Sequence, residues 1–175
     1  MKNIISIVLI SIFSFQMQAQ EWQTSKIEGY GKIKYFEDAA ERPDTTLNYK
    51  LVFDIKDGKE KEGVNVGLLK IARALNMLES GKILSEKIDI VAVVHGEATD
   101  LVLSNEKYQE KYNKTNPNIE LLKLLNDNGV KIFVCGQATA ARNIAQEDMN
   151  ESIQLALSAI SVLSNYQLRG YALIP

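Results

Sequence analysis

The chain contains one cysteine, Cys135, and one histidine, His95, the residue types best suited to nucleophilic and proton-transfer chemistry. Cys135 follows the apolar run 130–134 and precedes the helix-like stretch 137–143. Its sulfur should stand where a strand ends and a helix begins, and the unpaired backbone N–H groups there favour a thiolate. We therefore predict Cys135 as a catalytic nucleophile. The alternative is a small buried residue that caps the strand.

His95 is the second predicted catalytic residue, because it directly follows the apolar run 88–94. Imidazole changes charge near neutral pH and can hydrogen-bond or protonate a sulfur species if its strand neighbours that of Cys135. Strand order decides this and cannot be read from the sequence. In the alternative, the ring nitrogens bind loop backbone groups. Asp54, near the end of the run 49–55, is a weaker candidate with turn capping as its simpler role.

Composition excludes several classes of function. With one Cys and one His, the chain can form neither an internal disulfide nor a CxxC or all-protein Cys/His zinc site, so we predict no metal and no cofactor. A redox or metal-responsive role through these two residues would need sites shared between subunits. The net charge of −2 and the lack of a basic patch argue against nucleic acid as a partner.

The first 19 residues are typical of a secretory signal peptide. Lys2 precedes about ten mostly apolar residues at 4–13, fewer than the roughly 20 that span a membrane. Ala19 supplies a small residue at the cut site. We expect periplasmic localisation after cleavage, with no membrane attachment of the mature protein. The sequence then divides into a signal peptide (1–19), an N-terminal arm (20–48) and one domain (49–175).

Hydrophobic patterning predicts alternating strands and helices. Strands are expected at 49–55, 88–94, 130–134 and 171–174, with a short β-like stretch at 32–36. Apolar residues at helical spacing predict a helix from Val64 to about Ser80 and a longer one over 150–167. Shorter helices are expected at 106–112, at 137–143, and from Asn116-Pro117 to Asn128-Gly129. This alternation predicts an α/β fold, a three-layer α/β/α sandwich with a mainly parallel central sheet.

The residues around Cys135 carry a resemblance to a known family. The segment GVKIFVCGQATAAR (129–142) resembles the region of the reactive cysteine in the DsrE/DsrF-like proteins. The segments YKLVF (49–53), VVHG (93–96), NPN (116–118) and QLRGYALI (167–174) are similar to the exported branch of that family, which has a YchN-like fold. The resemblance implies an α/β/α sandwich that assembles into trimers or hexamers. It also implies that Cys135 carries a persulfide, as the matching cysteine does in sulfur-oxidising members.

Two hypotheses of function follow. In the first, the protein is a sulfur carrier or sulfurtransferase-like protein whose Cys135 passes sulfur between a small sulfur compound and a thiol-bearing acceptor protein. In the second, it is a non-enzymatic oligomeric module that binds a small ligand or a partner in the crevice beside Cys135. The reactivity of the thiol separates the two. Known sulfur relays of the family are cytoplasmic, so their donors and acceptors do not transfer to an exported chain.

Overall fold

The structure, a computed structural model, describes residues 21–175, so the predicted signal peptide lies outside the described residues. Five strands form one sheet in the order β6-β5-β4-β1-β7, and every neighbouring pair is parallel. Their bounds are β1 (Tyr49–Ile55), β4 (Ile88–Val94), β5 (Lys131–Cys135), β6 (Ile153–Ala156) and β7 (Ala172–Ile174). A separate antiparallel hairpin pairs β2 (Glu60–Lys61) with β3 (Val64–Asn65).

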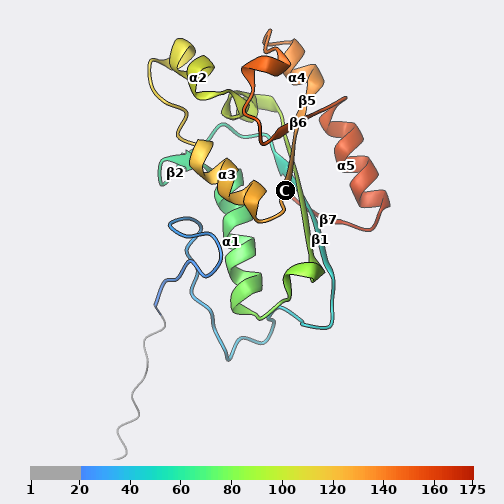
Figure 1. The fold of residues 1–175 in the computed structure, drawn as a ribbon. Coiled ribbons are helices and arrows are strands. Elements are labelled where there is room, and N and C mark those ends of the chain that lie inside the picture. The colour runs from blue at the N-terminus through green and yellow to red at the C-terminus, as the bar shows by residue number, and fades with distance from the viewer. Residues whose placement is uncertain (1–20) are drawn as a thin grey trace, which may run out of the picture.

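Helices cover both faces of the sheet, which confirms the predicted α/β/α sandwich (Figure 1). α1 (Val66–Ser80) and α3 (Ile119–Asp127) lie on one face, and α5 (Ala159–Leu168) lies on the other. Shorter helical elements connect the strands: α2 (Asn105–Tyr112), α4 (Gly136–Ala140) and the 3₁₀ segments η1 (Ser85–Lys87), η2 (Gly96–Val102) and η3 (Gln146–Asp148).

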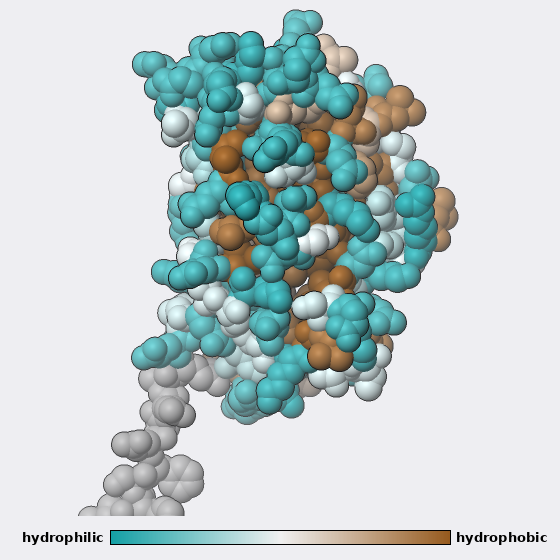
Figure 2. Space-filling view, viewed as in Figure 1, coloured by the Kyte–Doolittle hydropathy of each residue, from teal (hydrophilic) through white to brown (hydrophobic). Residues whose placement is uncertain are grey.

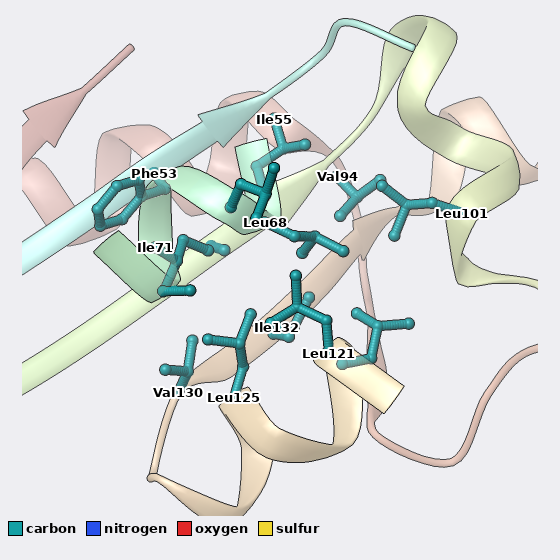
Figure 3. Packing of buried hydrophobic residues seen from close by; sticks show 14 of the residues in the cluster. Phe53, Ile55, Leu68, Ile71, Val94, Leu101, Leu121, Leu125, Val130 and Ile132 are labelled. Carbon is teal, nitrogen blue, oxygen red and sulfur yellow. The ribbon is translucent and has the colours of Figure 1, made fainter. Parts of the chain in front are cut away.

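The main core fills the space between the sheet and the pair α1 and α3. Figure 3 shows Leu68 and Ile71 of α1 and Leu121 of α3 beside Phe53 and Ile132 of the sheet. A second cluster fills the opposite face of the sheet, under α5. It contains Val52 of β1, Val91 and Val93 of β4, and Ala159 and Val162 of α5. Because side chains alternate along a strand, residues two apart on one strand face the same helices. This alternation decides which face each site residue occupies.

Residues 21–48 pack along α1 through the buried side chain of Asn76. Its carboxamide oxygen accepts hydrogen bonds from the backbone N–H groups of Lys26 (2.8 Å) and Ile27 (2.7 Å). Its nitrogen donates to the carbonyls of Tyr30 (2.8 Å) and Gly31 (3.0 Å). The β-like stretch predicted at 32–36 forms only a single bridge, from Gln23 to Ile33.

The helix predicted over 150–167 is wrong in its first part. Residues Ile153–Ala156 form the edge strand β6, paired with β5, and α5 begins only after Ser158. The apolar residues of this segment satisfy helical spacing by coincidence, but its first half also alternates in polarity. Pairing with the open edge of β5 outweighs local helix propensity. Ser158, two residues after the end of β6, caps α5, and its hydroxyl accepts a hydrogen bond from Ser161 N at 3.1 Å.

Two other helix boundaries differ from the prediction. Val64 belongs to β3, and α1 begins at Val66 with Asn65 as its N-cap. α3 begins at Ile119, two residues after the predicted first turn at Pro117. The residue at the N-cap position is Asn118, and Asn116 supports it from outside the helix, because its carboxamide oxygen accepts a hydrogen bond from Asn118 N at 3.0 Å. The Asn116 nitrogen donates to the carbonyls of Leu101 and Leu103.

Within residues 21–175, no helix is both long enough and apolar enough to cross a membrane.

Candidate functional site

The two predicted catalytic residues lie on neighbouring strands. β4 and β5 pair in parallel with Val94 opposite Val134. The next residue on each side is His95, directly after β4, and Cys135, the last residue of β5. Both have extended backbone angles. Side chains at the same level of parallel strands point to the same face. The structure thus brings His95 and Cys135 to the same level of the carboxyl edge of the sheet, which their sequence positions could not establish.

Asp54 joins this site from the other side of His95. The neighbour of β4 on that side is β1, and the His95 backbone N–H donates to the Ile55 carbonyl at 2.9 Å. Asp54 Oδ1 lies 2.6 Å from His95 Nε2, and both side chains are mostly buried. The turn-capping role considered for Asp54 is therefore wrong, because its carboxylate pairs with the imidazole. Lys56 Nζ lies 4.0 Å from the other carboxylate oxygen.

The Cys135 thiol is largely enclosed. The residue is 7% exposed and packs with Val91 and Val93 of the sheet and with Ala159 and Val162 of α5. Among residues 21–175, no hydrogen bond joins the His95 ring to the Cys135 sulfur. The geometry places the imidazole and the shielded thiol at the same level of neighbouring strands, with α5 packed against the thiol.

Gly136 lets the chain turn from β5 into α4 beside the edge strand. A Cβ atom added at Gly136 would lie 2.8 Å from the Ala156 carbonyl oxygen, so the close approach of β6 requires glycine here. The Gln137 side chain then donates to the Leu157 carbonyl at 3.1 Å. These two contacts hold the start of α4 against the end of β6, next to Cys135.

Arg142, after α4, connects two segments near the site, and its sequence position gave no indication of this contact. Its Nη2 donates to the Gly96 carbonyl at 2.7 Å, which ties the segment after Cys135 to the turn that follows His95. Its Nε lies 4.0 Å from Asp100 Oδ1. Spacing alone gave no signal for this contact, because residues 96 and 142 meet only when β4 and β5 pair.

Metal binding gains no support from this geometry. Within residues 21–175, no three His, Cys, Asp or Glu side chains lie close enough together to hold a metal ion. The arrangement that remains is a carboxylate, an imidazole and a thiol along three adjacent strands. The carboxylate orients the imidazole, and the thiol lies at the same level on the next strand.

Solved structures show that this fold occurs elsewhere. A protein of unknown function, MTH1491 from Methanobacterium thermoautotrophicum, is 21% identical with a TM-score of 0.55, over 72% of this chain and 97% of its own. The ychN protein from E. coli is 17% identical with a TM-score of 0.50, over 71% of this chain and 96% of its own. At such identities the likeness concerns the fold alone.

Comparison with sequences gives the family. No curated protein matches the chain. A model of the DsrE/DsrF-like family matches residues 50–175, which begins one residue after the start of β1 and includes Asp54, His95 and Cys135. Because this match spans well over half of the sequence, the chain belongs to the DsrE/DsrF-like family.

Proposed function

We propose that this protein is a sulfur carrier in which Cys135 holds a persulfide and passes the outer sulfur to an acceptor thiol. The observation that carries the proposal is the shared level of His95 and Cys135 at the carboxyl edge of β4 and β5. Reactive groups of open parallel sheets gather at this edge. Membership of a family with sulfur-relay members supports the same reading.

The transfer requires no external oxidant or reductant. The Cys135 thiolate attacks the outer sulfur of a persulfide donor, R–S–SH. A new sulfur–sulfur bond forms on Cys135 while the donor's own sulfur–sulfur bond breaks. The donor leaves as the thiolate R–S⁻, and the proton stays on the transferred sulfur. Attack by an acceptor thiolate on Cys135–S–SH reverses these steps and regenerates the Cys135 thiolate.

His95 and Asp54 have separate roles in this proposal. Asp54 pairs with Nε2 of His95, so the second ring nitrogen, Nδ1, is the one available to a sulfur species. A protonated ring stabilises the negative charge of a departing thiolate or of a loaded persulfide. Asp54 acts through the ring, by holding its orientation. It is a positioning residue.

A second candidate function is favoured by the burial of Cys135. With 7% of the residue exposed and apolar neighbours around it, the thiol resembles a packed small side chain. In that case the protein is a non-enzymatic module that binds a small ligand or a partner. The carrier proposal instead requires a donor small enough to reach the sulfur, or a displacement of α5.

The test is intact mass spectrometry after treatment with inorganic polysulfide. Wild type should gain one sulfur atom that a reductant removes and that a small acceptor thiol accepts. Cys135→Ser should gain none while keeping its circular dichroism spectrum. The binding-module reading predicts no reducible adduct, together with a thiol that iodoacetamide modifies only after denaturation.

The quaternary structure that we propose is a homo-oligomer, most simply a trimer or hexamer as the family resemblance implies. An apolar surface on α5 and the segment before it supports the oligomer, because Leu157, Ile160 and Leu168 are each more than three-quarters exposed. Figure 2 shows hydrophobic residues at the surface on the side where α5 lies. Exposed apolar clusters of this kind commonly mark protein interfaces.

We also propose that the chain is exported to the periplasm and cleaved near Gln20. The support is the charge and hydropathy pattern of residues 1–19. The N-terminal mass of protein recovered from the periplasm tests it. An intact N-terminus in the membrane fraction would contradict it.

A further inference from the structure

An apolar groove lies beside α1 at the β7 edge of the sheet, on the face opposite to the cluster that encloses Cys135. Its volume of about 330 Å³ is at the lower end of the roughly 300–1,000 Å³ typical of small-ligand sites. Leu51 and Phe53 of β1 and Ile174 of β7 form its floor, with Phe53 and Ile174 paired at the same level. In the described sheet no strand follows β7, and Leu51 and Ile174 stay half-exposed beside α1.

The wall of the groove is one stripe of α1. Lys70, Arg73, Ala74 and Met77 succeed one another at spacings of three, one and three residues, which places them on the same side of the helix. Because Ala74 carries only a methyl group, the stripe leaves space between the helix and the sheet. Met77 is 41% exposed at one end of this space. The groove is therefore an open margin of the main core.

The lining of the groove suits an apolar molecule. Among the described residues, Tyr49 is the one lining residue with an uncharged polar side chain, and its hydroxyl already accepts a hydrogen bond from Asp44 N at 2.6 Å. Apart from the cations Lys70 and Arg73, the other lining side chains are apolar. A polar molecule would lose hydrogen bonds to water here without replacing them. The occupant must be apolar along most of its length.

A cationic pocket of about 160 Å³ adjoins the groove, because Lys70 and Arg73 line both. Lys61 of β2 adds a third positive charge, and no acidic side chain of the described residues lines either pocket. Lys70 donates to the Pro175 carbonyl. Neither Lys61 nor Arg73 forms an ion pair with any residue that the structure describes. These two cations remain to meet an anion.

We propose that the groove binds a single-chain amphiphilic anion of the fatty-acid class, with its alkyl tail along Leu51 and Ile174 and its carboxylate at Arg73. The apolar groove and the adjoining cationic pocket match the two ends of such a molecule. The assignment is independent of sulfur transfer at Cys135.

A second copy of the chain matches this site less well. The other large apolar surface, on α5 and the segment before it, lies within residues 152–175. These residues contain no Asp or Glu. Seating that surface on the groove would cover the apolar floor but would leave Lys61 and Arg73 without an acidic side chain to pair with.

The test is calorimetric titration of the purified protein with probes below their micelle concentrations. Decanoate carries an alkyl tail and an anionic head, decyltrimethylammonium carries the same tail and a cationic head, and butyrate carries the anionic head on a short tail. Decanoate should bind at least about fivefold more tightly than decyltrimethylammonium, because Arg73 and Lys61 attract only its head. Octanoate should bind about tenfold more weakly than decanoate, since it buries two fewer methylene groups. Butyrate should show no measurable binding.

Variants assign the binding to this groove. Arg73→Gln should weaken decanoate about two- to fivefold and should not weaken decyltrimethylammonium. Ala74→Phe fills the space between α1 and the sheet and should weaken both by at least about tenfold. Lys123→Gln, which removes an exposed positive charge on α3, is the matched control and should change neither affinity. Cys135→Ser should bind decanoate as wild type does, which separates this site from sulfur transfer.

Three titration results would overturn the proposal. One is an absence of saturable decanoate binding to wild type. Another is decyltrimethylammonium binding as tight as that of decanoate. The third is unchanged decanoate affinity in both Arg73→Gln and Ala74→Phe, each with the wild-type circular dichroism spectrum. If Ala74→Phe does not fold, unchanged affinity in Arg73→Gln alone overturns the proposal.

Light scattering covers the alternative occupant. A folded Ala74→Phe should keep the mass of wild type, because the proposed ligand is a small molecule. A lower mass for this variant, together with no decanoate binding to wild type, would assign the groove to an interface between copies of the chain and overturn the proposal.

Discussion

His95 Nε2 lies 2.6 Å from Asp54 Oδ1, so the only histidine of the chain is held by a carboxylate from the neighbouring strand β1. On its other side, β5 places Cys135 at the same level of the sheet. The three side chains thus follow one another across adjacent strands β1, β4 and β5. Under the proposed function, this order predicts that Asp54 and His95 influence sulfur transfer through the same imidazole ring.

We predict that Asp54→Asn and His95→Ala each slow persulfide transfer from Cys135 by at least about tenfold. The double variant should be no slower than His95→Ala alone, because Asp54 acts only through the ring. Alkylation of Cys135 by iodoacetamide should be unchanged in all three. Asp57→Asn, which changes an exposed carboxylate in the loop that follows β1, is the control. Independent, additive losses would show that Asp54 does not work through His95.

A single charge on the exposed face of α5 should dissociate the proposed oligomer. Ile160→Asp places a carboxylate on a side chain that is 79% exposed in the single chain, where burial in an interface would be costly. Light scattering should report a lower mass for this variant than for wild type. Leu84→Asp, an exposed leucine beside η1, should leave the mass unchanged. A monomeric wild type at micromolar concentration contradicts the oligomer.

Asn76→Ala should release residues 26–31 from α1 and destabilise the protein. The substitution leaves two backbone N–H groups and two carbonyls without their partner. We expect a loss of about 2–4 kcal/mol in the free energy of unfolding by urea. Hydrogen exchange should speed up at Lys26 and Ile27. Asn126→Ala, on the exposed side of α3, is the control. Equal hydrogen exchange at Lys26 and Ile27 in the two variants would show that Asn76 does not hold residues 26–31 against α1.

Asp100 should contribute to stability in a pH-dependent manner. Burial alone would raise the pKa of Asp100, but hydrogen bonds from Lys111 and Tyr112 and the charge of Arg142 hold it below its ordinary 3.8. Because the folded pKa is lowered, the ionised carboxylate stabilises the fold fully above the ordinary pKa. This stabilisation is lost as the pH falls through the folded pKa.

Urea unfolding from neutral to acid pH checks this contribution. The stability difference between wild type and Asp100→Asn should stay constant above the ordinary pKa and shrink at lower pH. Asp38→Asn, in the exposed N-terminal segment, should show no such difference. A stability difference between wild type and Asp100→Asn that stays constant down to the lowest pH at which both proteins are folded would contradict the pairing of Asp100 with Lys111 and Tyr112.

Local sequence patterns were enough to predict most of the sheet and the edge on which the site lies. Residues 49–55 and 88–94 form strands as predicted, because β-branched and apolar side chains at these positions satisfy two buried faces. Residues that follow such strands must lie at the carboxyl edge. Cys135, His95 and Asp54 could therefore be assigned to one edge before any strand order was known.

Which of these residues meet depends on the order of the strands in the folded protein. The order β5-β4-β1 places His95 between Cys135 and Asp54, and strand order depends on contacts between segments about 40 residues apart. The same non-local pairing made residues 153–156 a strand at the edge of β5, where local spacing favoured a helix. The burial of Cys135 likewise depends on α5, whose position over the sheet follows from that pairing. Local sequence patterns indicate whether a segment forms a strand or a helix. The pairing of strands determines which side chains become neighbours and which are buried.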